Sequence, residues 1–237
     1  MPNQIRIIRK SLKGAIEKTR NGLFSRYARV SFAQECEDLL LMHQFPKKKR
    51  GFYVDVGALH PIRFSNTFAF YRKGWTGLVI EPNPEAIRQF GKVRKKDIFV
   101  EEGVAGSEGK LNYYRFTEPA FNTFDPQAAK LAEAEGRPVK DILERKTSPL
   151  RDILKRSLPN NAKIDFMSID VEGMDLEALK SNDWERFAPA WVIAEIARED
   201  DSPIADIINN PLARYISTLQ YEAIIKTGRS VIFKKCY

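Results

Sequence analysis

Four acidic residues stand at the ends of apolar segments of this chain: Asp55, Glu81, Asp170 and Glu195. The segments before them have the composition of buried strands. In an open sheet of parallel strands the carboxyl ends share one edge, and ligands bind outside that edge. We therefore expect these four carboxylates to line one site.

The loop after Asp55 limits the cofactors that this site could take. Its sequence, DVGALHP at residues 55–61, contains a single glycine, Gly57, and no lysine. A dinucleotide needs several glycines, because its pyrophosphate lies against the amides at a helix N-terminus. A cofactor without phosphate requires a less close approach of the backbone. S-adenosylmethionine is such a cofactor, and it is the one we expect.

Its chemical groups match the acids at this edge. Glu81 can accept both ribose hydroxyls with its two oxygens, and Asp55 can attract the ammonium group. The cofactor's carboxylate can meet the N-terminus of a helix that begins near Ser65, with Arg63 close by. The complete set of predicted cofactor-binding residues is Asp55, Gly57, Ala58, Arg63, Ser65, Asn66, Thr67, Glu81, Glu102 and Asp170.

Methyl transfer to an acceptor that must lose a proton needs a base within hydrogen-bond reach, and the acids supply candidates. If the segment stays extended, Asp170 and Glu172 point to one side, and two close carboxylates raise the pKa of one of them. They could equally hold a divalent cation, with Glu195 or His60 completing the shell. No specific spacing indicates a metal, so none is predicted, and proton abstraction is our first hypothesis.

The two histidines differ in their surroundings. His60 follows the glycine loop, and Pro61 keeps it out of a helix. It is therefore a fourth catalytic candidate beside Asp170, Glu172 and Glu195, although an isolated histidine can also be structural. His43 lies within an apolar helical run and is interpreted as a packed or surface residue.

Strand and helix patterns alternate from residue 31 onward. Strands are predicted at 51–57, 76–82, 97–105, 163–173 and 190–196, and helices at 38–45, 65–74, 83–93 and 176–184. Residues 221–235 predict a hairpin around Thr227-Gly228. This alternation predicts an α/β fold with a mostly parallel sheet covered on both faces.

Residues 106–163 are longer than a simple crossover, with helical runs that Pro126 and Pro138 break. We interpret them as an insertion that shapes a substrate pocket, or as a surface excursion.

The composition is that of one globular domain with an appendage: 237 residues, 43% hydrophobic, 30% charged and mean hydropathy −0.40. Two cysteines, Cys36 and Cys236, are too few for a disulfide framework, and no Cys/His cluster indicates zinc. No apolar run could span a membrane and no secretory signal is present, so we expect a cytoplasmic protein.

The net charge of +8 belongs to the first thirty residues. Eight of the 39 basic residues but one of the 31 acids lie in 1–30, which leaves 31 basic and 30 acidic residues for 31–237. The body therefore has no basic groove for nucleic acid. In the arm, apolar residues recur at helical spacing between the basic ones. Such a helix can rest on an anionic membrane at the inner face, or dock on its own domain, which needs no second partner.

Several motifs carry a resemblance to a known family. They are Asp55-Val56-Gly57-Ala58, Ser65-Asn66-Thr67, Gly74-Trp75, Glu81-Pro82-Asn83-Pro84 and Asp170-Val171-Glu172-Gly173. Together, and with the terminal hairpin, they resemble the FkbM family of S-adenosylmethionine-dependent O-methyltransferases over roughly residues 31–235. The resemblance implies a class I methyltransferase (Rossmann-like) fold, a seven-stranded mostly parallel sheet with an antiparallel C-terminal hairpin. It also implies methylation of a hydroxyl, frequently on a sugar or polyketide.

This chain departs from the family near its start. The family often shows Ser-Gln-x-Gly-Glu-Asp, and here Ala33 and Cys36 stand at the serine and glycine positions, with Gln34, Glu37 and Asp38 kept. Residues 1–30 fall outside the resemblance.

The sequence thus predicts an S-adenosylmethionine-dependent O-methyltransferase. The expected acceptor is a hydroxyl on a sugar, a glycan or glycolipid intermediate, or a related natural product. The alternatives are an NAD-dependent enzyme on a similar sheet and a binding module that keeps the fold without turnover. The missing glycines count against the first, and the intact Asp55, Gly57 and Glu81 count against the second.

Overall fold

The computed structural model describes residues 27–196 and 203–236. The chain divides into two units at Val30 and Ser31, and the second unit, Ser31–Tyr237, contains every strand and helix of the described residues. The amphipathic pattern predicted for the arm falls on residues 1–26, outside the described residues.

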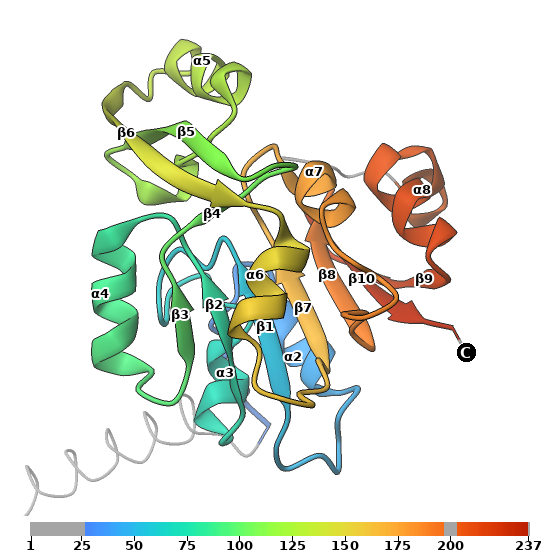
Figure 1. Ribbon diagram of the computed structural model, residues 1–237. Helices are drawn as coiled ribbons and strands as arrows, with labels where there is room; N and C mark the ends of the chain where they lie inside the picture. The colour runs from blue at the N-terminus through green and yellow to red at the C-terminus, as the bar shows by residue number, and fades with distance from the viewer. Residues whose placement is uncertain (1–26, 197–202, 237) are drawn as a thin grey trace, which may run out of the picture. The chain divides into compact units, whose positions relative to one another are not determined.

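A seven-stranded sheet forms the centre of this unit, with strand order β3-β2-β1-β7-β8-β10-β9. The strands from β3 to β8 in this order are parallel, and β10 runs antiparallel to both of its neighbours (Figure 1). The predicted sheet and its terminal hairpin are confirmed. The strands are β1 Phe52–Val56, β2 Thr76–Ile80, β3 Ile98–Val100, β7 Phe166–Ile169, β8 Trp191–Glu195, β9 Tyr221–Lys226 and β10 Ser230–Lys235.

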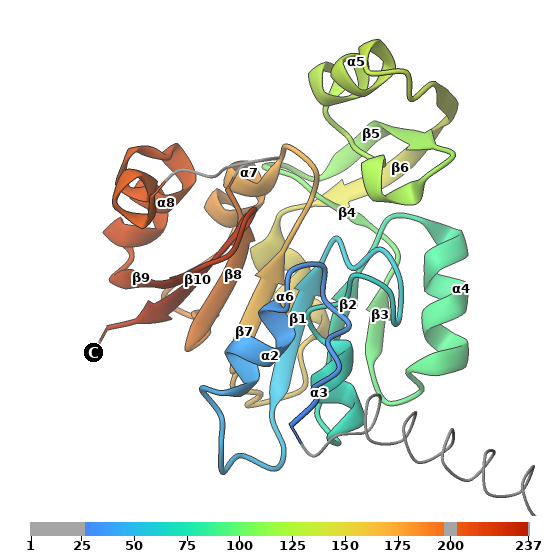
Figure 2. The same cartoon turned by 180° about the vertical axis from the view of Figure 1, so that it is seen from behind.

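Alternating residues of the strands face two helical layers. Val54 and Val56 belong to the larger apolar core, which packs on α6 (Leu150–Ser157), α7 (Asp175–Lys180) and α8 (Pro211–Thr218). Tyr53 belongs to an aromatic core on the other face of the sheet, with α2 (Glu37–Met42) and α3 (Phe68–Arg72). Figure 2 gives the view from that side of the molecule. Beside α3, α4 (Pro84–Val93) buries Phe90 against Val79. Both faces of the sheet are thus covered, as the alternation predicted.

A second sheet interrupts the crossover between β3 and β7. It contains β4 (Gly103–Val104), β6 (Val139–Ser148) and β5 (Gly109–Phe116) in that order, with the 3-10 helix η1 (Pro119–Phe121) and helix α5 (Pro126–Ala134) (Figure 1). The prediction of one strand over 97–105 was wrong, because β3 and β4 belong to different sheets. The helical interpretation of the residues around Pro138 was also wrong, since β6 follows directly. Pro126 begins a helix rather than breaking one.

Two elements before the hairpin were missed: the 3-10 helix η2 (Ile204–Asn209) and α8. The sequence does contain a typical helix-start pattern for α8, an asparagine followed by a proline. Asn210 accepts hydrogen bonds from the amides of Leu212 (2.8 Å) and Ala213 (3.4 Å), and Pro211 occupies the first turn. Among the described residues, no helix is long and apolar enough to cross a membrane.

The segment before α2 is fixed to the domain by two buried acids. Glu37 accepts hydrogen bonds from the Glu35 amide (2.8 Å) and the Ser230 hydroxyl (3.1 Å). Asp38 accepts from the Ser31 hydroxyl (2.6 Å) and the Phe32 amide (2.8 Å). Burial raises the pKa of Glu37 above its ordinary value. These two residues of the family pattern therefore hold the chain entry in place.

Cys36, at the family's glycine position, has φ 68°, a left-handed conformation that favours glycine. We expect Cys36→Gly to raise the free energy of unfolding by about 0.5–1 kcal/mol, because the strain of a side chain in this region is removed. Urea unfolding would measure the change. Asn161→Gly is the matched control, since Asn161 has φ 62° but asparagine tolerates this region, so its gain should be smaller. A loss of stability in Cys36→Gly would contradict this explanation.

Candidate active site

A cavity opens at the carboxyl ends of β1, β2 and β7. The space between its walls, with the open mouth and adjoining solvent included, is about 810 Å³. The main sheet contributes Gly57, Glu81 and Asp170, and the second sheet and its connections contribute Tyr113 and Thr123. The remaining lining residues are Gln34, Val56, Leu59, Phe64, Ile80, Pro82, Asn83, Glu102, Gly103, Val104, Pro119, Ala120, Asn122, Phe124, Val171, Glu172 and Met174.

Gly57 is required by the packing of the strands as well as by the cavity. Its φ is +75°, and a Cβ atom there would lie 1.7 Å from the carbonyl oxygen of Asp170. The ends of β1 and β7 can therefore approach each other only if residue 57 lacks a side chain. From the sequence, this glycine was expected to serve the cofactor alone.

Glu81 lies at the floor of the cavity and is 3% exposed. One carboxylate oxygen accepts a hydrogen bond from the Leu59 amide (2.9 Å) and the other from the Asn83 amide (2.8 Å). The Tyr113 hydroxyl donates to the same carboxylate, so three of its roughly four acceptor positions are taken and one remains for a ligand hydroxyl. Burial raises its pKa to about 7, although the two amides oppose that shift. This is the position predicted for the residue that accepts the ribose diol.

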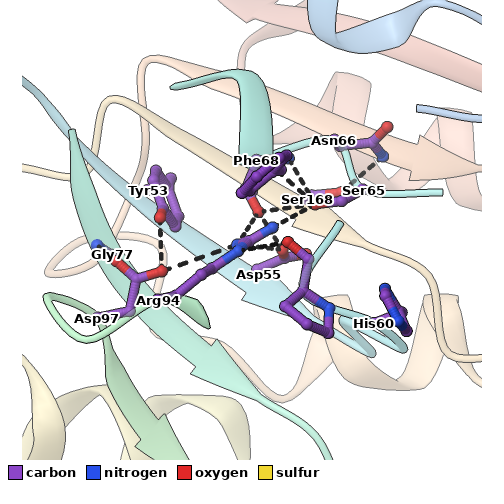
Figure 3. A network of polar contacts seen from close by, with 12 residues as sticks. Tyr53, Asp55, His60, Ser65, Asn66, Phe68, Gly77, Arg94, Asp97 and Ser168 are labelled. Carbon is purple, nitrogen blue, oxygen red and sulfur yellow. Dashed lines mark hydrogen bonds and ion pairs between the residues drawn. The ribbon is translucent and has the colours of Figure 1, made fainter. Parts of the chain in front are cut away.

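Asp55 does not line the cavity. Its carboxylate accepts a hydrogen bond from the Thr67 hydroxyl and lies 3.9 Å from the buried guanidinium of Arg94 (Figure 3). The same guanidinium donates to the hydroxyls of Thr67 (2.7 Å) and Ser65 (2.6 Å). Asp55, Ser65 and Thr67 thus form a buried structural network that engages the Asp55 carboxylate, and the attraction of Asp55 for the ammonium group, directly or through water, stays a prediction.

The hydroxyl of Ser65 also serves helix α3. It accepts hydrogen bonds from the amides of Thr67 (3.3 Å) and Phe68 (3.1 Å), so it orders the turn that leads into the helix, whose N-cap residue is Thr67. Asn66 turns toward the sheet, where its amide donates to the Ser168 hydroxyl at 3.0 Å. Neither residue lines the cavity.

His60 is also outside the cavity lining. Its Nδ1 accepts hydrogen bonds from the amides of Ile62 (3.0 Å) and Arg63 (2.9 Å), so the ring closes the loop. Burial, together with the charges of Arg63 and Arg94, lowers its pKa. With Nδ1 occupied as an acceptor, the neutral ring carries its proton on Nε2 and has no free base. This geometry gives His60 a structural task rather than the predicted catalytic one.

Two further predicted residues lie away from the cavity. Arg63 is exposed and forms an ion pair with Glu118 at 2.6 Å. Ala58 is buried among apolar residues with Val79 and Phe90. The structure therefore gives neither of them a contact with a ligand in the cavity.

The acids after β7 and β8 come together as predicted. One carboxylate oxygen from each of Asp170, Glu172 and Glu195 can lie within 4.8 Å of the others. The predicted reason was wrong, because β7 ends at Ile169 and Glu172 lies in a turn with φ 48°. We call these three residues the acidic cluster. Such a set can share a proton or hold a divalent cation.

A shared proton reduces the repulsion between these carboxylates without a bound cation. Burial raises the pKa of Glu195 to about 9, and the neighbouring Asp170, Glu172 and Asp175 add to the shift. Glu195 is hydrogen-bonded to Asp170, whose own pKa is raised by burial and partly lowered by this bond. The pair therefore favours one shared proton, and the strongly raised pKa of Glu195 makes that residue its carrier at neutral pH.

Glu102 lines the opposite side of the cavity. It accepts a hydrogen bond from Ser148 (2.8 Å) and forms ion pairs with Lys146 (3.1 Å) and with Arg156. Partial burial raises the pKa of Glu102, but these bonds outweigh burial and hold it below its ordinary value. The carboxylate is thus ionised and already well satisfied by the chain.

Sequence reasoning missed three residues that matter here. Tyr113 of β5 is buried at the cavity and hydrogen-bonded to Glu81, and burial raises its pKa. Asp175 joins the charges around Glu195, with a pKa raised by burial to about 7. Arg94 is fully buried although it precedes the lysines of a charged run. No local pattern marks Tyr113 or Arg94, whereas the apolar segment before Glu81 did mark that residue.

The strand order, the antiparallel terminal strands and an acid at the end of β2 define a class I methyltransferase fold. The model of the methyltransferase FkbM domain matches residues 55–213. The chain therefore belongs to the FkbM methyltransferase family, and the predicted family and class of enzyme are confirmed.

Solved structures offer more distant similarity. A TehB-like SAM-dependent methyltransferase from Corynebacterium glutamicum is 11% identical with a TM-score of 0.40, covering 94% of this chain and 97% of its own. The Burkholderia thailandensis 1,6-didemethyltoxoflavin-N1-methyltransferase is 10% identical with a TM-score of 0.45, covering 99% and 90%. An O-methyltransferase from Bacillus cereus is 13% identical with a TM-score of 0.38, covering 93% and 88%. A comparison with curated protein sequences gave no significant match. These values are too low to transfer any property, so the assignment depends on the family match.

We expect Glu81→Gln to weaken binding of a nucleoside cofactor by about tenfold to a hundredfold, since the amide nitrogen of glutamine would face a backbone amide. Isothermal titration calorimetry would measure the affinity. Glu133→Gln, at an exposed position of α5, is the matched control.

Binding should also depend on pH through Glu81. A diol is accepted best by the carboxylate form, so affinity should fall as the pH drops through about 7, by about fivefold between pH 7 and pH 6. This dependence should be absent in Glu81→Gln. An identical pH dependence in that variant would assign the titration to another group.

Proposed function

We propose that this protein is an S-adenosylmethionine-dependent O-methyltransferase whose acceptor is a hydroxyl on a sugar, a glycan or glycolipid intermediate, or a related natural product. The observation that carries the proposal is Glu81. It is a buried carboxylate at the carboxyl end of β2 that faces the cavity, held by two backbone amides and the Tyr113 hydroxyl, with acceptor capacity left on the cavity side. A ribose hydroxyl can donate to that remaining position, and the second hydroxyl of the diol can take the place of Tyr113.

The other residues of the cavity fit the same cofactor. Glu81 would hold the ribose, and the backbone after Gly57 would lie against the amino-acid tail. Asp170 and Glu172 supply negative charge for the ammonium and sulfonium groups. When bound, the cofactor supplies an activated methyl group with a good leaving group, so the chain has to align the acceptor and remove its proton.

Asp170 is the proposed base. It opens into the cavity, and the protonated Glu195 donates a hydrogen bond to it. That bond orients Asp170 and leaves its second oxygen for the acceptor hydroxyl. Glu172 keeps the local charge negative. A divalent cation on the acidic cluster is the second way to lower the pKa of a hydroxyl, and the same three residues would hold it.

The acceptor would enter beside the second sheet. We infer that the insertion, 106–163, shapes this part of the site, because Pro119, Ala120 and Phe124 line the cavity and the Thr123 hydroxyl donates to the Glu172 carbonyl at 2.8 Å. Phe64 is 42% exposed at the same cavity. Apolar walls next to a base suit a small molecule or glycan with hydroxyls on one side and apolar surface on the other.

We also infer a division of the chain into an arm, 1–30, and a methyltransferase domain, 31–237, in a protein located in the cytoplasm. The arm carries eight basic residues and one acid. That composition supports contact with an anionic membrane at its inner face.

The cofactor is tested by thermal unfolding. S-adenosylmethionine at a hundredfold excess over its Kd should stabilise the protein by about 2.7 kcal/mol, a rise in Tm of roughly 5–10 °C. NAD should leave Tm unchanged, because the loop has one glycine and no phosphate cradle. Stabilisation by NAD alone would favour the dehydrogenase alternative. Incubation with radiolabelled methyl donor and fractionated glycans, glycolipids and small molecules would then identify the acceptor.

The base is tested by two isosteric changes. Asp170→Asn should lower kcat by about 10²- to 10⁴-fold with binding of the donor largely kept, because the amide cannot accept a proton. Glu195→Gln should cost less than about tenfold, since glutamine still donates to Asp170. Single-turnover transfer of a labelled methyl group would compare them. Equal losses in both variants would remove Asp170 as the base.

A further inference from the structure

A group of uncompensated basic residues lies at the amino-terminal edge of the main sheet. We call it the basic edge, and it consists of Lys47, Lys49, Arg50, Lys73, Lys95 and Lys96. All six side chains are exposed, and within residues 27–196 and 203–236 none of them forms an ion pair with a described acid. Lys48 differs, because it pairs with Asp165. The basic edge therefore presents a concentrated positive charge to solvent.

The nearby acids are already occupied. Asp165 pairs with Lys48 and accepts a hydrogen bond from the Phe52 amide at 2.9 Å. Asp97 is 8% exposed and accepts from the Tyr53 hydroxyl (2.6 Å) and the Gly77 amide (2.9 Å). Both carboxylates are therefore engaged by other groups, and neither compensates the charge of a residue of the basic edge. The charge is thus available to an external partner.

Two hollows of the surface collect these side chains. One is lined by Lys49, Arg50, Lys73 and Lys96, with the backbone around Gly74. The other is lined by Lys47, Lys49 and Lys73 together with half-buried and buried apolar residues such as Phe45. The hollows share Lys49 and Lys73, and no carboxylate lines either one. Several cations thus converge on adjoining concave surfaces, which suits repeated anionic groups rather than a single acid.

The basic edge is separate from the active site. Its residues precede β1, β2 and β3, whose parallel arrangement places all three amino ends on one side. The cavity lies at the carboxyl ends of the same sheet. A strand of five residues spans roughly 15 Å at about 3.3 Å per residue, so the two surfaces are about that far apart or more. A partner on the basic edge would leave the mouth of the cavity open.

We propose that the basic edge is a docking surface for an anionic phospholipid membrane. The phosphate groups of lipids match it in charge, and their lateral freedom lets them fill adjoining hollows without a fixed spacing. Nucleic acid fits less well. Of the three aromatic residues that line the second hollow, Phe70 and Trp75 are each 1% exposed and Phe45 is half-buried, so successive bases would find no series of exposed rings on which to stack.

The test compares two variants of the full chain with equal net charge. In the first, Lys49, Arg50, Lys73 and Lys96 are changed to Gln. In the control, four basic residues elsewhere that also lack a described ion pair are changed to Gln: Arg88, Lys130, Lys140 and Lys155. Each basic residue near a lipid surface contributes about fivefold to binding, so the first variant should lose affinity by several hundredfold. The control should stay close to wild type.

Sedimentation with vesicles of phosphatidylcholine, with and without phosphatidylglycerol, would measure the affinity. Wild-type binding should require phosphatidylglycerol and weaken with salt. Circular dichroism and methyl transfer should be unchanged in both variants, since neither set lines the cavity. No vesicle binding by the wild type would overturn the proposal, and so would equal losses in the two variants.

Two probes exclude other anions. Single-stranded RNA and inorganic polyphosphate are titrated against the same proteins. Binding of either one that depends on the basic edge, with vesicle binding unaffected by the first variant, would overturn the lipid assignment. Vesicle binding that depends on the edge and persists in the presence of polyphosphate at equal phosphate would support it.

Discussion

The buried guanidinium of Arg94 is the interaction on which the carboxyl edge of the sheet depends. Arg94 follows α4 and is 0% exposed, with hydrogen bonds to the Pro61 carbonyl (2.8 Å) and to the hydroxyls of Ser65 and Thr67 (Figure 3). The carboxylates of Asp55 (3.9 Å) and Asp97 (3.7 Å) balance its charge. Removing one partner of such a buried group costs about 3–5 kcal/mol, because the remaining charge is left uncompensated. Five points of the chain are thus fixed by one side chain.

The glycine loop needs this restraint because its backbone is strained. Besides Gly57, both Leu59 (φ 54°) and Phe64 (φ 55°) occupy the left-handed region, which costs of order 1–3 kcal/mol for a residue with a side chain. Glu81 holds the Leu59 amide from the cavity side, while Arg94 holds the Pro61 carbonyl from the core side. The loop is therefore prepared before any ligand binds, and the cofactor does not have to order it.

The sequence predicted the parts of this arrangement that depend on local pattern. Apolar runs ending in acids placed Glu81 and Asp170 at one cavity, because parallel strands bring their carboxyl ends together. The same rule could not separate Glu81 from Asp55, since which acid faces the cavity depends on a partner distant in the chain. Arg94 is that partner, and in the sequence it is one member of a charged run that resembles solvent-exposed surface. The second sheet was missed for a related reason. Most positions of β6 are exposed or half-buried, so the strand buries little apolar surface. Its sequence therefore lacks the regular alternation of apolar and polar residues by which a strand is predicted.

Acids gathered at one sheet edge repel each other, and this protein relieves that repulsion in two ways. On the core side, Arg94 compensates Asp55 with a permanent charge, so that region is fixed and has no role in proton transfer. On the cavity side no guanidinium is present among the described neighbours of Asp170, and a proton held by Glu195 provides the compensation. A proton can be exchanged, whereas an arginine charge cannot. The acidic cluster therefore keeps an exchangeable proton and negative charge, which are the properties that the proposed base requires, and both follow because no arginine compensates Asp170 among its described neighbours.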